Sequence, residues 1–341
     1  MEKGRAVTLG DIAESLSLSK STVSRALRGD TRISSATRKR VRVHAEQVGY
    51  QPDPLISSLA SHGWRKRQGS HAGMNVAYII HNAQGIGSRR FPGAQQRAEQ
   101  LGYVCDCLNI AEHGSIDRLI RVAYSRGIRG LIVGFTASQQ LAQVQDMPWD
   151  RFSVVASGIG SRRLPMHSVS INGVEAMHLA WRKATESGAR RLGLAALKFE
   201  RDSEMDHQKY GTFLLRQLQL PEALRLPVWR GTPRDYGSLR KWVEEHRPDC
   251  VFGTQDSVYQ MLPEAGSSTS LPYSFISLYA GELQDQRISG IANCGEHIGS
   301  TAMDLLDAAI QRHEPGLPGR PLRVMLDPEW REGRSLRQLS R

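Results

Sequence analysis

Two short helical patterns joined by a tight turn begin the chain, and no other feature limits its N-terminal fold as strongly. The first pattern covers residues 8–16. Thr8 can cap this helix, and Asp11, three residues later, can complete a short-chain form of the capping box. Ser19 can cap a second helix over about residues 20–28, and a glycine follows it as a natural stop. Because helices this short are stable only when their apolar faces pack together, the sequence predicts a compact helix-turn-helix unit.

The second helix has an apolar face and a polar, basic face. The inner side carries Val23, Ala26 and Leu27. The outer side carries cations and short hydroxyls, namely Lys20, Ser21, Ser24, Arg25 and Arg28. A helix that presents such groups from its N-terminal end suits the major groove of DNA. There Arg25 can donate two hydrogen bonds to the edge of a guanine. The alternative that the pattern leaves open is a charged helix face that is simply solvated.

A third helix is expected over residues 35–48, capped by Ser34. Its expected inner stripe consists of Ala36, Val41, Ala45 and Val48. Pro54 then fits the first position of a short fourth helix, whose apolar stripe is Leu55, Ile56 and Leu59. This stripe has no core of its own, so it can pair with a symmetry-related copy, insert Leu59 into the DNA minor groove, or pack as a linker on the neighbouring domain.

The segments 7–13, 19–27, 34–38 and 49–52 together resemble the DNA-binding domain of the LacI/GalR family of bacterial transcription regulators. The resemblance implies that Lys20, Ser21 and Arg25 read bases. It also implies backbone-contact or positioning roles for Ser19, Thr22, Ser24, Arg28, Ser34, Thr37 and Tyr50. Leu59 matches the hinge-helix leucine that enters the central minor groove in this family. One departure is Asp53, which stands before Pro54 where many members carry Asn.

The basic charge is concentrated at the N-terminal end of the chain. Residues 1–70 hold +7 of the total formal charge of +11. A basic domain on a nearly neutral body predicts a polyanionic partner, and double-stranded DNA is favoured over a membrane because no apolar segment reaches spanning length. With no export signal recognised, we expect a cytoplasmic, nucleoid-associated protein. The four cysteines fit no zinc spacing, so we expect them to be small buried residues and expect neither a metal nor a cofactor.

The remainder of the chain alternates strand and helix patterns in two successive series, which predicts an α/β fold with doubly wound parallel sheets. We expect a headpiece over residues 1–51, a hinge helix and linker over 52–72, and a two-lobed core over 73–341. The first lobe would comprise about residues 73–170 and 297–323, and the second about 171–296 and 324–341. This core resembles the effector-binding domain of the same family, which is similar to periplasmic sugar-binding proteins.

The resemblance places a small-molecule effector between the lobes, where strands of both sheets end. Its candidate ligands are His81, Asn82, Asn172, Arg201, His207, Gln255 and Tyr279. Asn172 stands where the family commonly has Asp, and either His207 or Arg201 falls near the family's anchoring Arg. A sugar or related metabolite is the first effector class to consider, but carboxylates, which normally hold sugar hydroxyls together with amides and Arg, are few among these positions. For each residue, a purely structural hydrogen bond remains the alternative.

These features together predict a regulator, most simply a repressor, that binds a pseudo-palindromic operator as a homodimer under effector control. A transcriptional activator of the same fold is the first alternative, and a cytoplasmic solute-binding protein is the second. We do not expect an enzyme, because no catalytic constellation or phosphate-binding glycine loop stands out in the sequence. The sequence shows no leucine-rich C-terminal coiled coil of the kind that tetrameric members add, so a dimer is expected.

Overall fold

The structure is a computed structural model of the chain. It describes residues 9–27, 33–48, 74–81, 83, 87–134, 147–158, 165–197, 204–262, 273–280, 287–292 and 294–338. The chain divides into two compact units, residues 1–72 and residues 73–341. The expected hinge helix over residues 52–72 lies outside the described residues.

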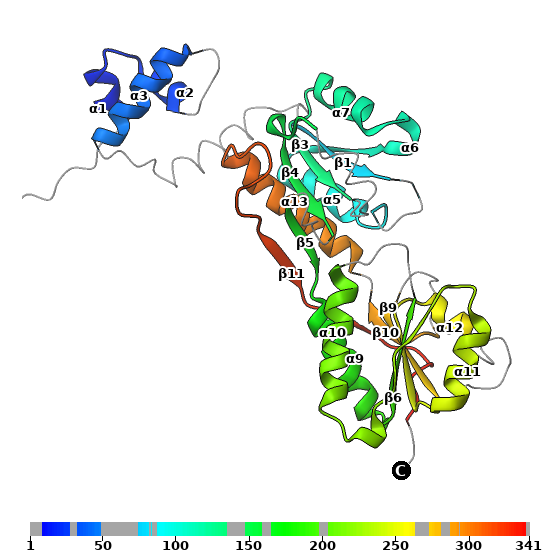
Figure 1. The fold of residues 1–341 in the computed structure, drawn as a ribbon. Helices are drawn as coiled ribbons and strands as arrows, with labels where there is room; N and C mark the ends of the chain where they lie inside the picture. The colour runs from blue at the N-terminus through cyan, green and yellow to red at the C-terminus, as the bar shows by residue number, and fades with distance from the viewer. Residues whose placement is uncertain are drawn as a thin grey trace, which may run out of the picture. The chain divides into compact units, whose positions relative to one another are not determined.

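The described residues of the N-terminal unit form three short helices around a small apolar core (Figure 1). These helices are α1 (Leu9–Ser15), α2 (Lys20–Leu27) and α3 (Ser35–Gln47). Their shared core consists of Ile12, Ala13, Val23, Ala26, Val41 and Ala45. The expectation that Ala36 belongs to this core is wrong, because Ala36 is exposed. It precedes Val41 by five residues, and at about 100° per residue it therefore lies far around the helix from the inner face.

The first sheet of the core has six parallel strands in the order β11-β5-β4-β3-β1-β2. The strands are β1 (Asn75–Ile80), β2 (Val104–Asn109), β3 (Gly130–Val133), β4 (Ser153–Ser157), β5 (His167–Ile171) and β11 (Arg323–Leu326). Among the described residues, its helices are α5 (Phe91–Leu101), α6 (Ile110–His113), α7 (Ile116–Ser125), α13 (Gly295–Gln311) and the 3-10 helix η1 (Trp149–Arg151). This arrangement confirms the doubly wound pattern predicted for the first lobe.

The second sheet has the order β12-β10-β9-β8-β6-β7 and is parallel except for β12, which pairs antiparallel with β10. The strands are β6 (Leu192–Leu197), β7 (Trp229–Gly231), β8 (Cys250–Gly253), β9 (Ser274–Ala280), β10 (Gly290–Ala292) and β12 (Trp330–Arg331). The helices are α9 (Gly173–Glu186), α10 (Glu204–Leu218), α11 (Tyr236–His246), α12 (Ser257–Met261) and the 3-10 helix η2 (Glu222–Leu224).

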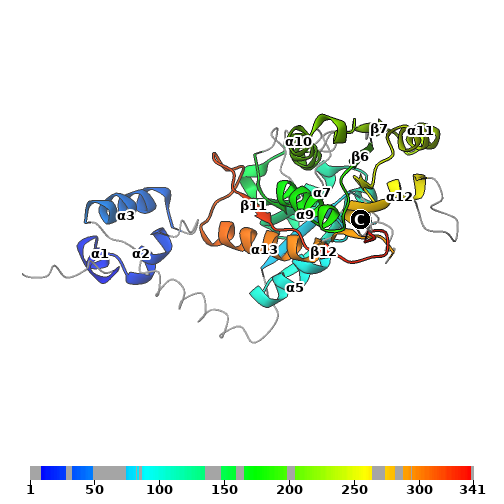
Figure 2. The ribbon, with the colours of Figure 1, turned by 90° about the horizontal axis from the view of Figure 1, so that it is seen from below.

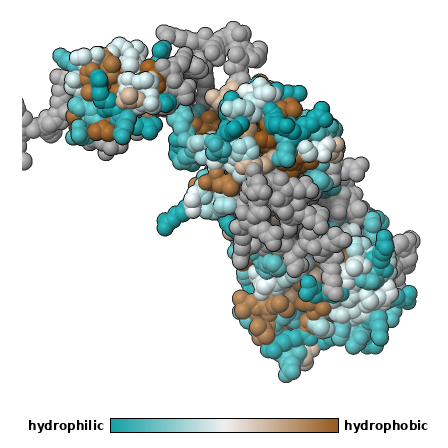
Figure 3. All heavy atoms as spheres, turned by 45° about the horizontal axis from the view of Figure 1, so that its top comes forward, coloured by the Kyte–Doolittle hydropathy of each residue, from teal (hydrophilic) through white to brown (hydrophobic). Residues whose placement is uncertain are grey.

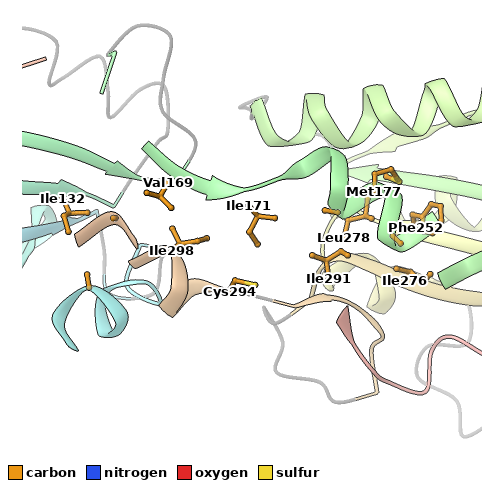
Figure 4. Packing of buried hydrophobic residues seen from close by; sticks show 14 of the residues in the cluster. Ile132, Val169, Ile171, Met177, Phe252, Ile276, Leu278, Ile291, Cys294 and Ile298 are labelled. Carbon is orange, nitrogen blue, oxygen red and sulfur yellow. The ribbon is translucent and has the colours of Figure 1, made fainter. Parts of the chain in front are cut away.

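The central strands are buried on both faces, so alternate side chains enter different apolar clusters. One cluster covers a face of each sheet, where α5 packs against α13 and α9 packs against α10 (Figure 2). Figure 4 shows this cluster extending from Ile132 and Val169, past Ile171 and Cys294, to Phe252. Two smaller clusters cover the opposite faces, one under α7 and the other under α11 and α12. The two lobes therefore share one apolar core.

The chain passes between the sheets three times, after β5, after β10 and after β11. The last crossing from the first lobe to the second lies later in the chain than the lobe boundary expected between residues 323 and 324. Arg323–Leu326 pairs in parallel with β5, from Arg323 opposite Ser168 to Leu326 opposite Ile171. This strand completes the edge of the first sheet, so the chain turns to the second lobe only beyond Leu326.

The cysteine prediction is partly wrong, because Cys107 is exposed while Cys105, Cys250 and Cys294 are buried. Cys107 lies on β2, which is an edge strand of the first sheet.

Figure 3 shows hydrophobic residues at the surface of the second lobe, and α10 exposes the side chains of Leu214, Leu215 and Leu218. Within the described part of the chain, no helix is long and apolar enough to cross a membrane.

Candidate DNA-binding surface and effector site

The turn between α1 and α2 is held by backbone and side-chain hydrogen bonds. Ser17 adopts a left-handed conformation with φ of 52°, and the Leu18 amide donates to the Ala13 carbonyl at 2.9 Å. Arg40 on α3 donates from Nη2 to the Leu16 carbonyl at 2.7 Å. Arg40 thereby ties α3 to the end of α1, where a carbonyl would otherwise lack a helical partner. The turn thus fixes where α2 begins.

The N-terminus of α2 is capped by Ser19. Its Oγ accepts from the Thr22 amide at 3.1 Å and lies 2.8 Å from the hydroxyls of both Ser21 and Thr22. The first turn of α2 contains no acidic residue, so the positive end of the helix dipole is not neutralised within it. Hydroxyls and free amides at such a helix end favour phosphate oxygens.

The residues expected to read bases lie on the open side of α2. Lys20, Ser21 and Arg25 are exposed, whereas Thr22 and Ser24 are half-buried. Val23 and Ala26 point into the core, which fixes the rotation of the helix and leaves the cationic side free. The structure therefore brings the three base-reading candidates together on one accessible face.

A second hydroxyl pair lies at the start of α3. The Oγ of Ser34 accepts from the Thr37 amide at 3.2 Å and lies 2.8 Å from the Thr37 hydroxyl. Ser34 is exposed, so its remaining hydrogen-bonding capacity faces solvent. The other expected DNA-binding residues are Arg28, Tyr50 and Leu59, and they lie outside the described residues.

Several effector-site candidates follow the carboxyl ends of strands. His81 is exposed directly after β1, Gln255 is half-buried two residues after β8, and Tyr279 lies near the end of β9. His207 is exposed on α10, close to the N-terminus of that helix. Asn82 and Arg201 lie outside the described residues.

Asn172 has a structural role at the start of α9. Its Oδ1 accepts from the amides of Val174 and Glu175, each at 3.2 Å. These bonds satisfy two of the amides that have no partner within the first turn of a helix. Among the described candidates, Asn172 is thus the one whose side-chain oxygen is already used as a helix cap.

Two buried cations near these strand ends were missed in the sequence analysis. Arg90 precedes α5 and is 7% exposed, and Lys209 on α10 is 3% exposed. A pattern did point to Lys209, because it precedes the buried Phe213 by four residues and therefore shares the inner face of its helix. No comparable pattern marks Arg90, whose burial depends on the packing of the first lobe.

The chain thus combines a capped helix-turn-helix domain with an α/β core of two lobes whose sheets are mainly parallel. Residues 8–53 match the model of "Bacterial regulatory proteins, lacI family". The N-terminal unit therefore contains a lacI-family helix-turn-helix domain, which confirms the resemblance to the LacI/GalR family.

Similar proteins are found in sequence and in structure. The HTH-type transcriptional regulator Rv3575c of Mycobacterium tuberculosis is 26% identical over 205 residues, which is 59% of this chain and 55% of that protein. The aligned region thus spans little more than half of that relative. A lac repressor dimer bound to operator and the anti-inducer ONPF matches with a TM-score of 0.56 at 15% identity, covering 98% of this chain and 100% of that one. The complex of the transcriptional regulator CelR with cellobiose matches with a TM-score of 0.55 at 18% identity, covering 96% and 99%.

Proposed function

We propose that the chain is a sequence-specific DNA-binding regulator of transcription that reads its operator with α2. The observation that carries this proposal is the exposure of Lys20, Ser21 and Arg25 on one side of a capped helix within a lacI-family domain. Arginine can donate two hydrogen bonds to the guanine O6 and N7 atoms, whereas the hydroxyls and helix amides suit phosphates. The domain thus combines base reading with backbone contacts on one surface.

The proposed active form is a homodimer on a pseudo-palindromic operator. A single α2 helix covers only a few base pairs, so two copies related by two-fold symmetry would read two half-sites. The lac repressor dimer bound to operator, whose fold resembles this chain, supports this arrangement. Residues 52–72, between the headpiece and the core, would supply the hinge contacts.

The core is proposed to bind a small-molecule effector and to alter DNA affinity through the arrangement of its lobes. Such coupling requires that the effector binds one arrangement more tightly than the other. The strand-end positions of His81, Gln255 and Tyr279 support an effector site, since ligands of open α/β sheets bind at carboxyl ends of strands. The CelR–cellobiose complex supports a sugar or related metabolite as the first class to test.

Repression is the proposed direction of regulation, as in the lac repressor of similar fold. Activation by the same protein is the alternative, because the sign depends on where the operator lies relative to the promoter. A solute-binding protein that does not regulate transcription would need no base-reading surface, and the exposed cations of α2 disfavour it.

The test is a selection of random DNA duplexes on the purified full-length protein, followed by affinity measurements across a salt series. A sequence-reading dimer should enrich a pseudo-palindrome, and log Kd should depend on log salt with a slope of about 0.9 per phosphate contact. If random duplexes are bound as tightly as the selected ones, with and without candidate effectors, the proposal is wrong.

A further inference from the structure

The guanidinium of Arg90 is buried at the N-terminus of α5 with few partners. It is 7% exposed, and its Nη1 donates to the carbonyl of Ser157 at the end of β4. Its Nε is buried and has no hydrogen-bond partner among the described residues. Ser157 is itself held in place, because its hydroxyl accepts from the Tyr78 hydroxyl at 2.8 Å. One edge of the guanidinium is thus anchored, while Nε on the other edge has no partner among the residues that the structure describes.

No carboxylate neutralises Arg90 within the described part of the chain. The groups that interact with it electrostatically are the phenols of Tyr78 and Tyr279. Burial raises the pKa of Tyr78 to about 12, so this hydroxyl stays neutral at pH 7. Burial also lowers the pKa of Arg90. Because a buried charge without a counter-charge costs several kcal/mol, native proteins rarely keep one without a functional reason.

A second buried cation lies beside strand β9 of the other lobe. Lys209 is 3% exposed and donates from Nζ to the carbonyl of Leu278 at 2.7 Å. An ammonium group has three donor hydrogens, so this bond leaves donor capacity unused. Leu278 immediately precedes Tyr279, the residue of the second lobe that interacts with Arg90. The two cations therefore flank the same end of β9.

Both cations lie at a position where open α/β folds bind ligands. Helix α5 follows β1 in the sequence, and Arg90 at its N-terminus reaches Ser157 at the carboxyl end of β4. Leu278 and Tyr279 lie near the carboxyl end of β9 in the second sheet. Ligands of such folds bind outside the carboxyl ends of the parallel strands. The first turn of α5 also contains no acidic residue that would repel an anion.

We propose that the effector of this protein is an anion, with a carboxylate or phosphate group that pairs with the Nε–Nη2 edge of Arg90. This proposal rests on the proposed function, because it names the chemical class of the effector. The side edge of a guanidinium matches the two oxygens of a carboxylate or phosphate, which accept two parallel hydrogen bonds. Lys209 adds a second positive charge on the side of β9. A neutral sugar would leave the charge of Arg90 uncompensated.

The test measures the thermal unfolding of the full-length protein in chloride, inorganic phosphate, gluconate or glucose, at pH 7.0 and matched ionic strength. The variants are Arg90→Met, which removes the guanidinium, and Arg118→Met, a matched control on the exposed side of α7. Phosphate or gluconate should raise the Tm of the wild type and of Arg118→Met, whereas Arg90→Met should show no anion-specific rise. The anion with the larger effect identifies a phosphate or a carboxylate as the preferred group.

Arg90→Lys keeps the proposal testable if Arg90→Met does not fold. A lysine retains the charge but loses the two-donor edge, so anion affinity should weaken by about tenfold or more. Equal anion responses in the wild type and in the folded Arg90 variants would overturn the proposal, as would stabilisation of the wild type by glucose alone. No DNA is present in this experiment. Its failure would therefore leave the DNA-binding proposal intact, and failure to select an operator would leave the anion result standing.

Discussion

Arg25 is the residue for which the proposed DNA reading makes the sharpest prediction. It is exposed on α2 and its side chain can form two hydrogen bonds with a guanine. Arg25→Ala should reduce the discrimination between the selected operator and random DNA by about 1–3 kcal/mol. Competition binding with labelled operator measures this difference.

The matched control for Arg25 is Arg42→Ala, which removes the same charge from the exposed side of α3. Losing a cation that acts only through long-range electrostatics should weaken binding to operator and to random DNA about equally. If Arg25→Ala behaves like this control, Arg25 contributes charge rather than sequence reading.

Lys209 should make the stability of the core depend on alkaline pH. Burial lowers the pKa of its ammonium to about 8, from an ordinary value of 10.5, and Asp206 partly offsets this effect. The unfolded chain therefore holds this proton more tightly than the folded one, and the penalty is fully present below about pH 8. As pH rises from about 8 towards 10.5, the group should add at most ~1.4 kcal/mol of stability per pH unit.

The measurement compares urea unfolding of the wild type and Lys209→Met between pH 8 and 9.5. The Met side chain retains most of the packing but cannot titrate, so its stability should rise less steeply with pH than that of the wild type. Parallel curves for the two proteins would show that Lys209 keeps its ordinary proton affinity in the folded state.

At the scale of elements, the stability of helix α9 tests whether Asn172 has a structural role rather than a ligand-binding one. Its Oδ1 caps two amides of the helix. Asn172→Ala should destabilise the core by about 1 kcal/mol, whereas Asn172→Asp keeps an oxygen acceptor and should remain close to wild type. Urea unfolding followed by tryptophan fluorescence measures both. A wild-type stability for the Ala variant would remove the capping role.

Elements with strong local signals were predicted from the sequence. Capping serines and helix-ending glycines located α2 and α3. Strands β5 and β10 carry no comparable local signal. Each is short, and β5 alternates serine with apolar residues, so its burial on both faces comes from the neighbouring strands and α13 rather than from its own composition.

The two candidate sites likewise differ in how far local sequence patterns predict them. The accessible side of α2 could be predicted because helical periodicity places Val23 and Ala26 on the inner face and leaves Lys20, Ser21 and Arg25 outside it. The effector region joins residues that are distant in sequence, such as Arg90 and Ser157, and no local pattern encodes such a contact. Sequence analysis selected polar residues after strands, but it could not identify Arg90 as a cation that packing would bury.

At the scale of the whole core, one apolar cluster links both sheets, and this makes the two lobes cooperative. Ile171 is 3% exposed at the end of β5 and lies in the section of the cluster that runs between the sheets (Figure 4). Its truncation to Ala should cost about 2–5 kcal/mol, as for other large-to-small changes in cores. Because the cluster is continuous, this loss should be felt by strands of both lobes.

Hydrogen exchange under mildly denaturing conditions tests this cooperativity. The amides of β3 in the first lobe and β8 in the second should open with the same free energy in the wild type. Ile171→Ala should lower both values by the same amount. Ile120→Ala offers a contrast, because Ile120 belongs to the cluster that covers only the outer face of the first sheet. If Ile171→Ala loosens β3 while leaving β8 protected, the lobes unfold separately and the shared cluster does not couple them. Coupling through this cluster would let a ligand at the strand ends of one lobe stabilise the other, as the proposed effector response requires.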